Sequence, residues 1–176
     1  MPADTQPARQ TVPAHQMVEV LTTGGTIDKV YFDALSEFQI GNPQVGRVLQ
    51  QAGVAGEYTI TPLLRKDSLE LSDADRAALR HAVAQSPAAR LIITHGTDTM
   101  VESARALAGI AGKTVVLVGA MQPAGLRVSD AEFNIGFAWA CVQTLPAGVY
   151  IAMNGQVFDP AHARKNRAAH RFEPLP

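Results

Sequence analysis

The sequence predicts an α/β domain of three layers, in which a mostly parallel sheet carries helices on both faces, as in flavodoxin-like and Rossmann-like folds. Two short apolar runs rich in β-branched residues, 91–94 and 114–118, are typical of strands buried on both faces. Each is followed by a segment whose apolar residues recur at helical spacing. The Asn154-Gly155 pair is a hairpin-turn signal, and it predicts a short antiparallel edge near the C-terminus.

Strand and helix signals alternate along the whole chain. The expected strands cover residues 17–22, 58–64, 91–94, 114–118 and 148–153, with a short returning strand at 156–158. Helices are expected between them, and capping residues mark the expected start of each helix. The expected starts are Asn42 with Pro43 for a helix over 43–52 that stops at Gly53, and the capping boxes Ser72/Asp75, Thr99/Glu102 and Ser129/Glu132.

Composition limits the classes of function. The chain has 176 residues and a net charge of −1, from 15 basic and 16 acidic side chains, so it offers no electrostatic case for binding nucleic acid or an anionic membrane. Cys141 is the single cysteine and falls in an apolar helical pattern, which favours a core position and a reducing compartment. Residues 1–15 contain three prolines and no apolar block. We therefore expect a disordered leader at 1–15, a single domain at 16–176 and a cytoplasmic protein.

Polar residues follow three of the predicted strands at the point where each strand ends. Thr26 comes after two glycines, Asp67 and Ser68 follow the second strand, and Thr97 and Asp98 follow the third. The carboxyl ends of parallel strands meet at one edge, where free backbone N–H groups bind ligands. The sequence therefore predicts a binding site at this edge, although a plain turn at Thr26 and helix caps at the other positions are the simpler interpretations.

Two further segments bear on the predicted site. Residues 28–41 form a connection too long for a simple turn, so we expect a lid or binding loop. Tyr31 lies five residues beyond Thr26, and its phenol could relay a proton or bind the Thr26 hydroxyl, with a half-buried structural tyrosine as the alternative. The basic tail, residues 159–176, is by itself typical of solvated surface.

Several of these segments resemble a known family. The stretches TTGGTID, ITHGTDTMVESA and VVLVGAMQPAG, followed by an SD and an FN pair, are similar to signature stretches of the bacterial-type L-asparaginases. The segment MNGQVFDPAHARK resembles the family's stretch in which a lysine follows an M-N pair, and this places that lysine at Lys165. The resemblance runs in order from about Met17 to about Arg167.

The resemblance implies an amidohydrolase that converts L-asparagine to L-aspartate and ammonia. Thr26 then corresponds to the primary nucleophile and Tyr31 to the lid tyrosine, while Thr97, Lys165 and Asp98 correspond to a proton-transfer set. Such chemistry needs a base near the hydroxyl, because an alcohol is a poor nucleophile until its proton is removed. The free N–H groups of the two glycine-containing turns are the expected donors to the oxyanion.

The resemblance also implies how the substrate is held. Asp98 corresponds to the group that binds the α-ammonium and Ser68 to the group that binds the α-carboxylate, with Gly25 and Thr97 beside them. Leu69 departs from the polar residue frequent in larger members, and Asp67 is expected to supply that contact. Larger members continue into a smaller C-terminal domain, and a neighbouring subunit completes their site from it. This chain resembles a short form that consists of the N-terminal α/β domain only, and a homo-oligomer is expected.

Other functions fit some of the same residues. A non-catalytic amino-acid-binding module would use Asp98 and Ser68 without needing Thr26 or Lys165, and the amidase component of a transamidation complex would use them all. Glutamine is an alternative substrate. A nucleotide or flavin module would suit the fold, but the phosphate-binding spacings do not occur in the sequence. The five histidines show no ligand spacing, so neither a metal nor a cofactor is expected.

Overall fold

The computed structural model describes residues 17–32 and 37–175, and the predicted leader at 1–15 lies outside them. A six-stranded sheet forms the centre, and its first five strands are parallel. The last strand is antiparallel to its neighbour. In spatial order the strands are β4 (Tyr58–Pro62), β1 (Val18–Thr22), β5 (Arg90–Thr94), β6 (Thr114–Val118), β7 (Gly148–Met153) and β8 (Gln156–Phe158). The predicted fold class is confirmed.

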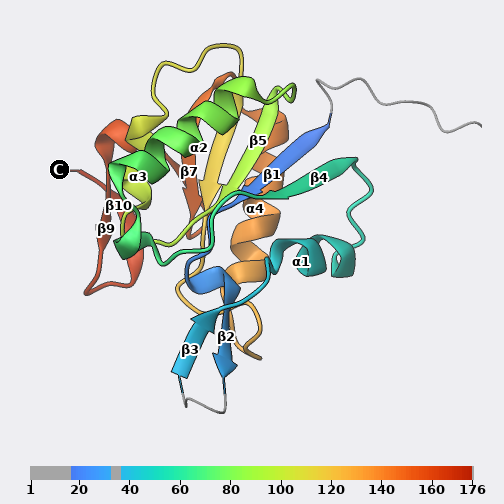
Figure 1. Cartoon of the computed structure of the whole chain (residues 1–176), viewed down its shortest axis with the longest axis vertical. Helices are drawn as coiled ribbons and strands as arrows, with labels where there is room; N and C mark the ends of the chain where they lie inside the picture. The colour runs from blue at the N-terminus through green and yellow to red at the C-terminus, as the bar shows by residue number, and fades with distance from the viewer. Residues whose placement is uncertain (1–16, 33–36, 176) are drawn as a thin grey trace, which may run out of the picture.

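Helices cover both faces of this sheet (Figure 1). On one face α4 packs against β5, β6 and β7, with α1 beside it; on the other, α3 packs against β7, with α2 beside it. The α-helices of the described residues are α1 (Val45–Gln51), α2 (Asp73–Gln85), α3 (Met100–Ala106) and α4 (Ala131–Thr144). Among the described residues, none of the helices combines the length and the apolar character that crossing a membrane would require.

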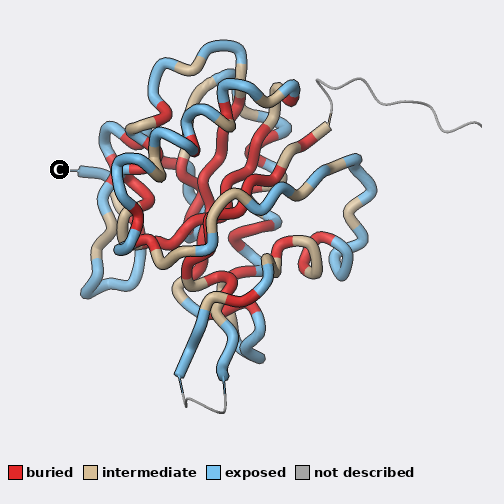
Figure 2. Tube along the Cα trace, viewed as in Figure 1, coloured by how far each residue is buried: buried red, intermediate tan, exposed pale blue. Residues whose placement is uncertain are grey.

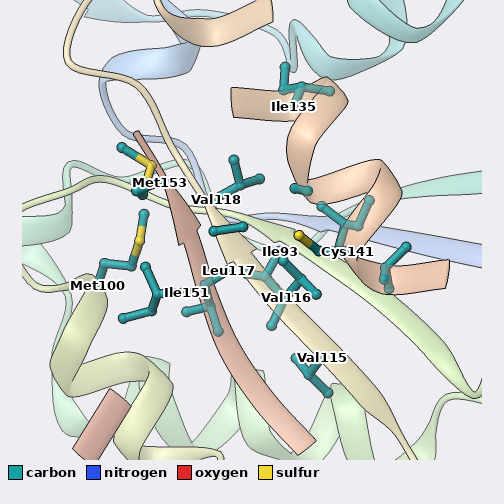
Figure 3. Close-up of a cluster of buried hydrophobic side chains, with 14 of the residues drawn as sticks. Ile93, Met100, Val115, Val116, Leu117, Val118, Ile135, Cys141, Ile151 and Met153 are labelled. Carbon is teal, nitrogen blue, oxygen red and sulfur yellow. The ribbon is translucent and has the colours of Figure 1, made fainter. Parts of the chain in front are cut away.

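The core lies where the predicted two-sided strands run. Every residue of β6 is buried, as are the last four of β5, so the centre of the molecule is continuous buried chain (Figure 2). Met100 from α3 and Ile135 from α4 lie on opposite sides of β6 (Figure 3). Cys141 is buried in the same core, as its apolar pattern predicts. Burying aliphatic side chains on both faces is the main source of stability for such a sheet.

The predicted boundaries of α1 and β4 are wrong, and so is the predicted capping hydrogen bond of α3. The first helix begins at Val45 with Gln44 as N-cap, because the Asp28 carboxylate accepts the Gln44 N–H at 2.8 Å. Thr99 is the N-cap of α3 as predicted, but its side chain makes no capping hydrogen bond, and its hydroxyl donates to the Ser68 carbonyl at 2.7 Å. In both cases a polar group at the helix start is bonded to a partner distant in sequence. The second strand ends at Pro62 rather than at residue 64.

The cap of α4 also differs from the prediction. This helix starts at Ala131 with Asp130 as N-cap, and Ser129 lies one position earlier, where its Oγ accepts the Ala131 N–H. The Asp130 carboxylate accepts the N–H groups of Met121 and Gln122, so it closes the loop after β6. The box at Ser72 and Asp75 is confirmed, with both reciprocal hydrogen bonds present.

The expected lid segment contains regular structure rather than an irregular loop. A 3₁₀ turn η1 (Thr26–Asp28) leads into a hairpin of β2 (Lys29–Phe32) and β3 (Glu37–Ile40) that projects from the body (Figure 1). The tip, residues 33–36, lies outside the described residues. Aromatic side chains on this hairpin are exposed, and the Tyr31 and Phe38 rings meet edge to face at 5.5 Å.

The C-terminal part confirms one prediction and corrects another. Asn154 and Gly155 both have positive φ, 55° and 72°, as a two-residue hairpin turn between β7 and β8 requires. The basic tail is not simply solvated surface. After a short 3₁₀ turn, η3 (Pro160–His162), it forms a hairpin of β9 (Ala163–Asn166) and β10 (Arg171–Pro174), which packs beside α3.

Candidate functional site

Three loops meet at the carboxyl edge of β4, β1 and β5. The strands end in register, since Thr22 pairs with Pro62 on one side and with Thr94 on the other. The loops that follow are in close backbone contact. A Cβ on Gly25, whose φ is +91°, would lie 2.4 Å from the Gly96 nitrogen, and a Cβ on Gly96 would lie 2.5 Å from Ser68 Oγ. Glycine is therefore required at both positions, and the predicted convergence of the three loops occurs.

Lys165 joins the β5 loop from a strand far along the chain. Its Nζ donates to Thr97 Oγ1 at 2.7 Å and to Asp98 Oδ1 at 2.9 Å, across more than sixty residues of sequence. Thr97 is buried, and the Lys165 side chain is 15% exposed. The Arg167 Nε donates to the same Asp98 oxygen at 3.2 Å. Burial opposes ionisation of Asp98, but Lys165 and Arg167 outweigh it and lower its pKa, so the carboxylate is charged at neutral pH.

Asp67 and Ser68 lie on the β4 loop, at the start of the 3₁₀ turn η2 (Ser68–Glu70). The Asp67 carboxylate caps this turn by accepting the Leu69 N–H, and it forms an ion pair with Lys29 at 2.8 Å. Burial disfavours the ionised form of Asp67, but Lys29 and the Leu69 N–H outweigh burial and lower the pKa of this carboxyl group. Ser68 is 1% exposed, and its Oγ has no hydrogen-bond partner among the described residues. A buried hydroxyl without a partner is uncommon in folded proteins and points to a ligand or water.

Thr26 begins η1, directly after Gly25, and is partly exposed. Its loop contacts the Thr97 loop through Gly25 and Gly96. Tyr31 lies on the projecting hairpin with 54% of its surface exposed. In the part of the chain that the structure describes, no hydrogen bond joins Tyr31 to Thr26. The structure thus brings Thr97, Asp98 and Lys165 into contact and leaves Tyr31 apart from them.

Sequence reasoning missed two buried ionisable residues at this edge. His95 is fully buried, and burial is the main cause that lowers its pKa to about 4. Asp28 is 1% exposed, and burial raises its pKa to about 6 against the opposing hydrogen bond from Gln44. The sequence signals for His95 were its place directly after an apolar strand and inside the ITHGTDTMVESA stretch. Asp28 ends the TTGGTID stretch, but no local signal marked its burial, because its partner is the Gln44 N–H, sixteen residues further along the chain.

Two cavities border the site. One of about 370 Å³ is lined by Asp98, Lys165 and Arg167 with parts of α3. The other, of about 410 Å³, is lined by Lys29, Arg65 and Asp67 with residues of β3. Both contain opposite charges at close range, which suits a small zwitterionic ligand better than an apolar one. Within residues 17–32 and 37–175, no three potential ligands of the His, Cys, Asp or Glu type gather as a metal site would require.

Comparison with known proteins identifies the family. The family model described as "Asparaginase, N-terminal" matches residues 17–173. The chain belongs to this asparaginase family. It is 29% identical over 150 residues to a glutamyl-tRNA(Gln) amidotransferase subunit from Thermoplasma acidophilum, and the match covers 81% of this chain and 36% of that protein. It is 30% identical over 155 residues to the probable periplasmic L-asparaginase of Haemophilus influenzae, covering 80% and 43%.

A solved asparaginase shares the same architecture. The probable cytoplasmic L-asparaginase of Campylobacter jejuni superposes with a TM-score of 0.77 at 26% identity, over 90% of this chain and 53% of that one. The chain therefore spans about a third to a half of the length of these relatives. The matched residues contain all the loops of the site described above.

Proposed function

We propose that this asparaginase-family chain is an amidohydrolase that converts L-asparagine to L-aspartate and ammonia through a threonine-linked acyl-enzyme. The observation that carries the proposal is the contact of Lys165 Nζ with both Thr97 Oγ1 and Asp98 Oδ1. A buried hydroxyl, an amine and a carboxylate in one hydrogen-bonded set can move a proton during catalysis. A module that only binds amino acids has no need of such a set.

In the proposed reaction the Thr26 oxygen attacks the side-chain amide carbon of the substrate. The proton released from Thr26 passes to the set of Thr97, Lys165 and Asp98, and a proton returns to the departing ammonia. Backbone N–H groups of the Gly25 and Thr97 loops stabilise the oxyanion while the carbon is tetrahedral. Water then cleaves the aspartyl ester, which releases aspartate and restores the Thr26 hydroxyl.

Charge and burial support a binding mode for the substrate. The ionised Asp98 is suited to the α-ammonium, and the unpartnered Ser68 hydroxyl is suited to the α-carboxylate. In this binding mode Gly25 and Thr97 lie beside the substrate, and Asp67 contributes together with Lys29, whose ammonium pairs with Asp67 and is the positive group closest in sequence to the Thr26 loop. No cofactor is needed for this chemistry, because every proton and every bond is accounted for by side chains, substrate and water.

The first test is ammonia release from L-asparagine and from L-glutamine by the wild type, Thr26→Ala and Thr97→Ala. Thr59→Ala, an exposed threonine on β4, is the matched control. We expect wild-type hydrolysis of asparagine, a loss of at least about 100-fold in kcat for both site variants, and no loss for the control. A folded wild type that binds asparagine but releases no ammonia would instead be a binding module.

Rapid quenching followed by peptide mass spectrometry separates the two threonines. We expect to find the aspartyl ester on the peptide that contains Thr26. An ester found on Thr97 would retain the amidohydrolase and reverse the roles of the two hydroxyls.

The second candidate is the amidase component of a transamidation complex, which the similarity to the Thermoplasma amidotransferase protein favours. Such a component would release ammonia from glutamine rather than from asparagine. The ratio of kcat/KM for the two amides in the same assay therefore decides between the candidates.

We also propose a cytoplasmic homo-oligomer. The name of the Campylobacter relative supports the location, while the Haemophilus relative is named periplasmic. The exposed aromatic side chains of the β2–β3 hairpin support association. Cell fractionation tests the location, and light scattering coupled to gel filtration tests the oligomeric state.

A further inference from the structure

His95 connects three elements at the centre of the site without having any exposed surface. It follows the last residue of β5, and its backbone N–H donates to the Val118 carbonyl of β6 at 2.9 Å. Its Nδ1 lies 2.7 Å from the Gly96 carbonyl oxygen, and its Nε2 lies 2.8 Å from Ser103 Oγ on α3. Because burial keeps its pKa near 4, the ring is neutral at physiological pH.

These two contacts determine the tautomer of the ring. A carbonyl oxygen can only accept a hydrogen bond, so Nδ1 must carry the proton that reaches Gly96. The neutral ring then has an unprotonated Nε2, which accepts the hydrogen of the Ser103 hydroxyl. Both ring nitrogens are satisfied only in this form.

The bond to Gly96 also orients the Thr97 N–H. The Gly96 carbonyl and the Thr97 N–H belong to one planar trans peptide unit, so they point in opposite directions. The hydrogen bond from His95 to the Gly96 carbonyl therefore directs the Thr97 N–H away from the imidazole ring. Among the described residues this N–H has no hydrogen-bond partner, which leaves it free for a ligand.

The same peptide lies where the three loops touch. Gly96 contacts Gly25 of the Thr26 loop and Ser68 of the β4 loop. On its other side, a Cβ on Gly119 would lie 2.4 Å from the His95 carbonyl oxygen, so the chain after β6 also packs closely against His95. A rotation of the Gly96–Thr97 peptide would therefore displace the donor and the loops beside it together.

We propose that His95 is a positioning residue, which as the neutral Nδ1–H tautomer holds the Gly96–Thr97 peptide so that the Thr97 N–H stabilises the oxyanion. This inference rests on the proposed amidohydrolase function. His95 itself exchanges no proton with the substrate. Its effect is on the direction of a hydrogen-bond donor that acts in the transition state, so its loss should lower kcat and leave KM nearly unchanged.

Two substitutions separate the two ring nitrogens. His95→Asn places an amide nitrogen at about the position of Nδ1 and retains a donor to Gly96. His95→Gln places its amide near Nε2 and retains only the contact with Ser103. We expect kcat within about threefold of wild type for His95→Asn and a loss of at least about tenfold for His95→Gln, with KM changed by less than about threefold in both.

Ser103→Ala is the control for structure alone. It removes the partner of Nε2, so we expect a lower Tm and an unchanged kcat. Circular dichroism and melting curves verify that all three variants are folded at the assay temperature. Equal losses of kcat in His95→Asn and His95→Gln, or no loss in His95→Gln, would overturn the proposal.

A second measurement needs no substrate and therefore stands apart from the proposed function. Long-range ¹H–¹⁵N spectra of the imidazole should show the neutral Nδ1–H tautomer throughout the range from about pH 8 to about pH 5.5. Amide hydrogen exchange at Thr97 should change in His95→Gln and not in His95→Asn. An Nε2–H tautomer, or a titration near the ordinary histidine pKa, would contradict the positioning role. If the wild type releases no ammonia, the proposed function and the oxyanion role of the Thr97 N–H both fail. These two measurements still test whether His95 holds the Gly96–Thr97 peptide.

Discussion

The two threonine loops of the site are built in different ways. Thr97 is 4% exposed, and its hydroxyl accepts a hydrogen bond from Lys165, which reaches it from β9. Thr26 is partly exposed and stands beside a projecting hairpin whose aromatic residues face solvent. The folded chain therefore preorganises the first loop completely and leaves the second open on one side. This difference suits the proposed reaction. Proton transfer at the Thr97 loop needs fixed distances, whereas the Thr26 loop must be accessible to the substrate.

The largest expected effect is the loss of kcat when the preorganised Thr97 loop loses its contact with Lys165. Lys165→Met retains the length of the side chain and removes the amine from Thr97 and Asp98, so we expect kcat for asparagine to fall by about 1,000-fold. Steady-state kinetics measure this loss. Lys66→Met is the control, since Lys66 pairs with Asp75 and not with Thr97 or Asp98, and its kcat should stay within about threefold. A Lys165→Met enzyme with near wild-type kcat would remove Lys165 from the mechanism.

Asp28 tests how the Thr26 loop is held. Its pKa is about 6 in the folded chain against 3.8 in the unfolded one, so between these values the folded state binds more protons. The free energy of unfolding therefore falls as pH rises from about 4 to about 6 and remains lowered above that. Asp28→Asn removes this cost, and we expect it to be more stable than wild type by on the order of 2 kcal/mol at pH 8, with little difference at pH 4.

Urea unfolding at the two pH values measures the difference. Asp75→Asn is a control of opposite sign, because Lys66 and Ser72 lower the pKa of Asp75 to about 2, and its stabilisation is lost only as pH falls. That variant should be less stable than wild type at pH 8. Equal stability of Asp28→Asn and wild type at pH 8 would mean that Asp28 is hydrated.

Tyr31 tests whether the open side of the Thr26 loop takes part in catalysis. Tyr31→Phe removes only the phenol hydroxyl of an exposed side chain, so the Tm should not change. If the hairpin closes over bound substrate and the phenol meets Thr26, kcat should fall by about tenfold. Phe38→Leu, on the paired strand, provides the comparison for hairpin packing alone. An unchanged kcat in Tyr31→Phe would restrict the chemistry to the two threonine loops.

The smallest expected effect concerns Arg167, which shares the Asp98 oxygen with Lys165. The proposed α-ammonium of the substrate competes with this exposed guanidinium for the same carboxylate. Arg167→Ala should therefore lower KM for asparagine by about threefold at low salt, with a smaller change at high salt. Arg164→Ala is the matched control, because Arg164 is paired with Glu173 instead. A KM that rises in Arg167→Ala would show that Arg167 assists binding.

The sequence alone determined the order and type of most elements. Runs of β-branched residues in β5 and β6 predict buried strands because no other element accommodates them so well, and the Asn154-Gly155 turn predicts the antiparallel edge through its backbone preference. The glycines before Thr26 and Thr97 and the polar residues after three strands predict a site at the carboxyl edge of the sheet. These signals are local, so they can be read without knowledge of the fold.

Only the tertiary structure decided which partner each polar group takes. Thr99 and Asn42 have the chemistry of helix caps, but Thr99 binds the distant Ser68 carbonyl and the Asp28 carboxylate moves the first cap to Gln44. The lysine indicated by family resemblance meets Thr97 because β9 packs beside α3, and His95 is buried because β6 and α3 enclose it. Hydrogen bonds and pKa values at this site depend on such long-range packing, since burial removes water and leaves the nearest protein group as the only partner.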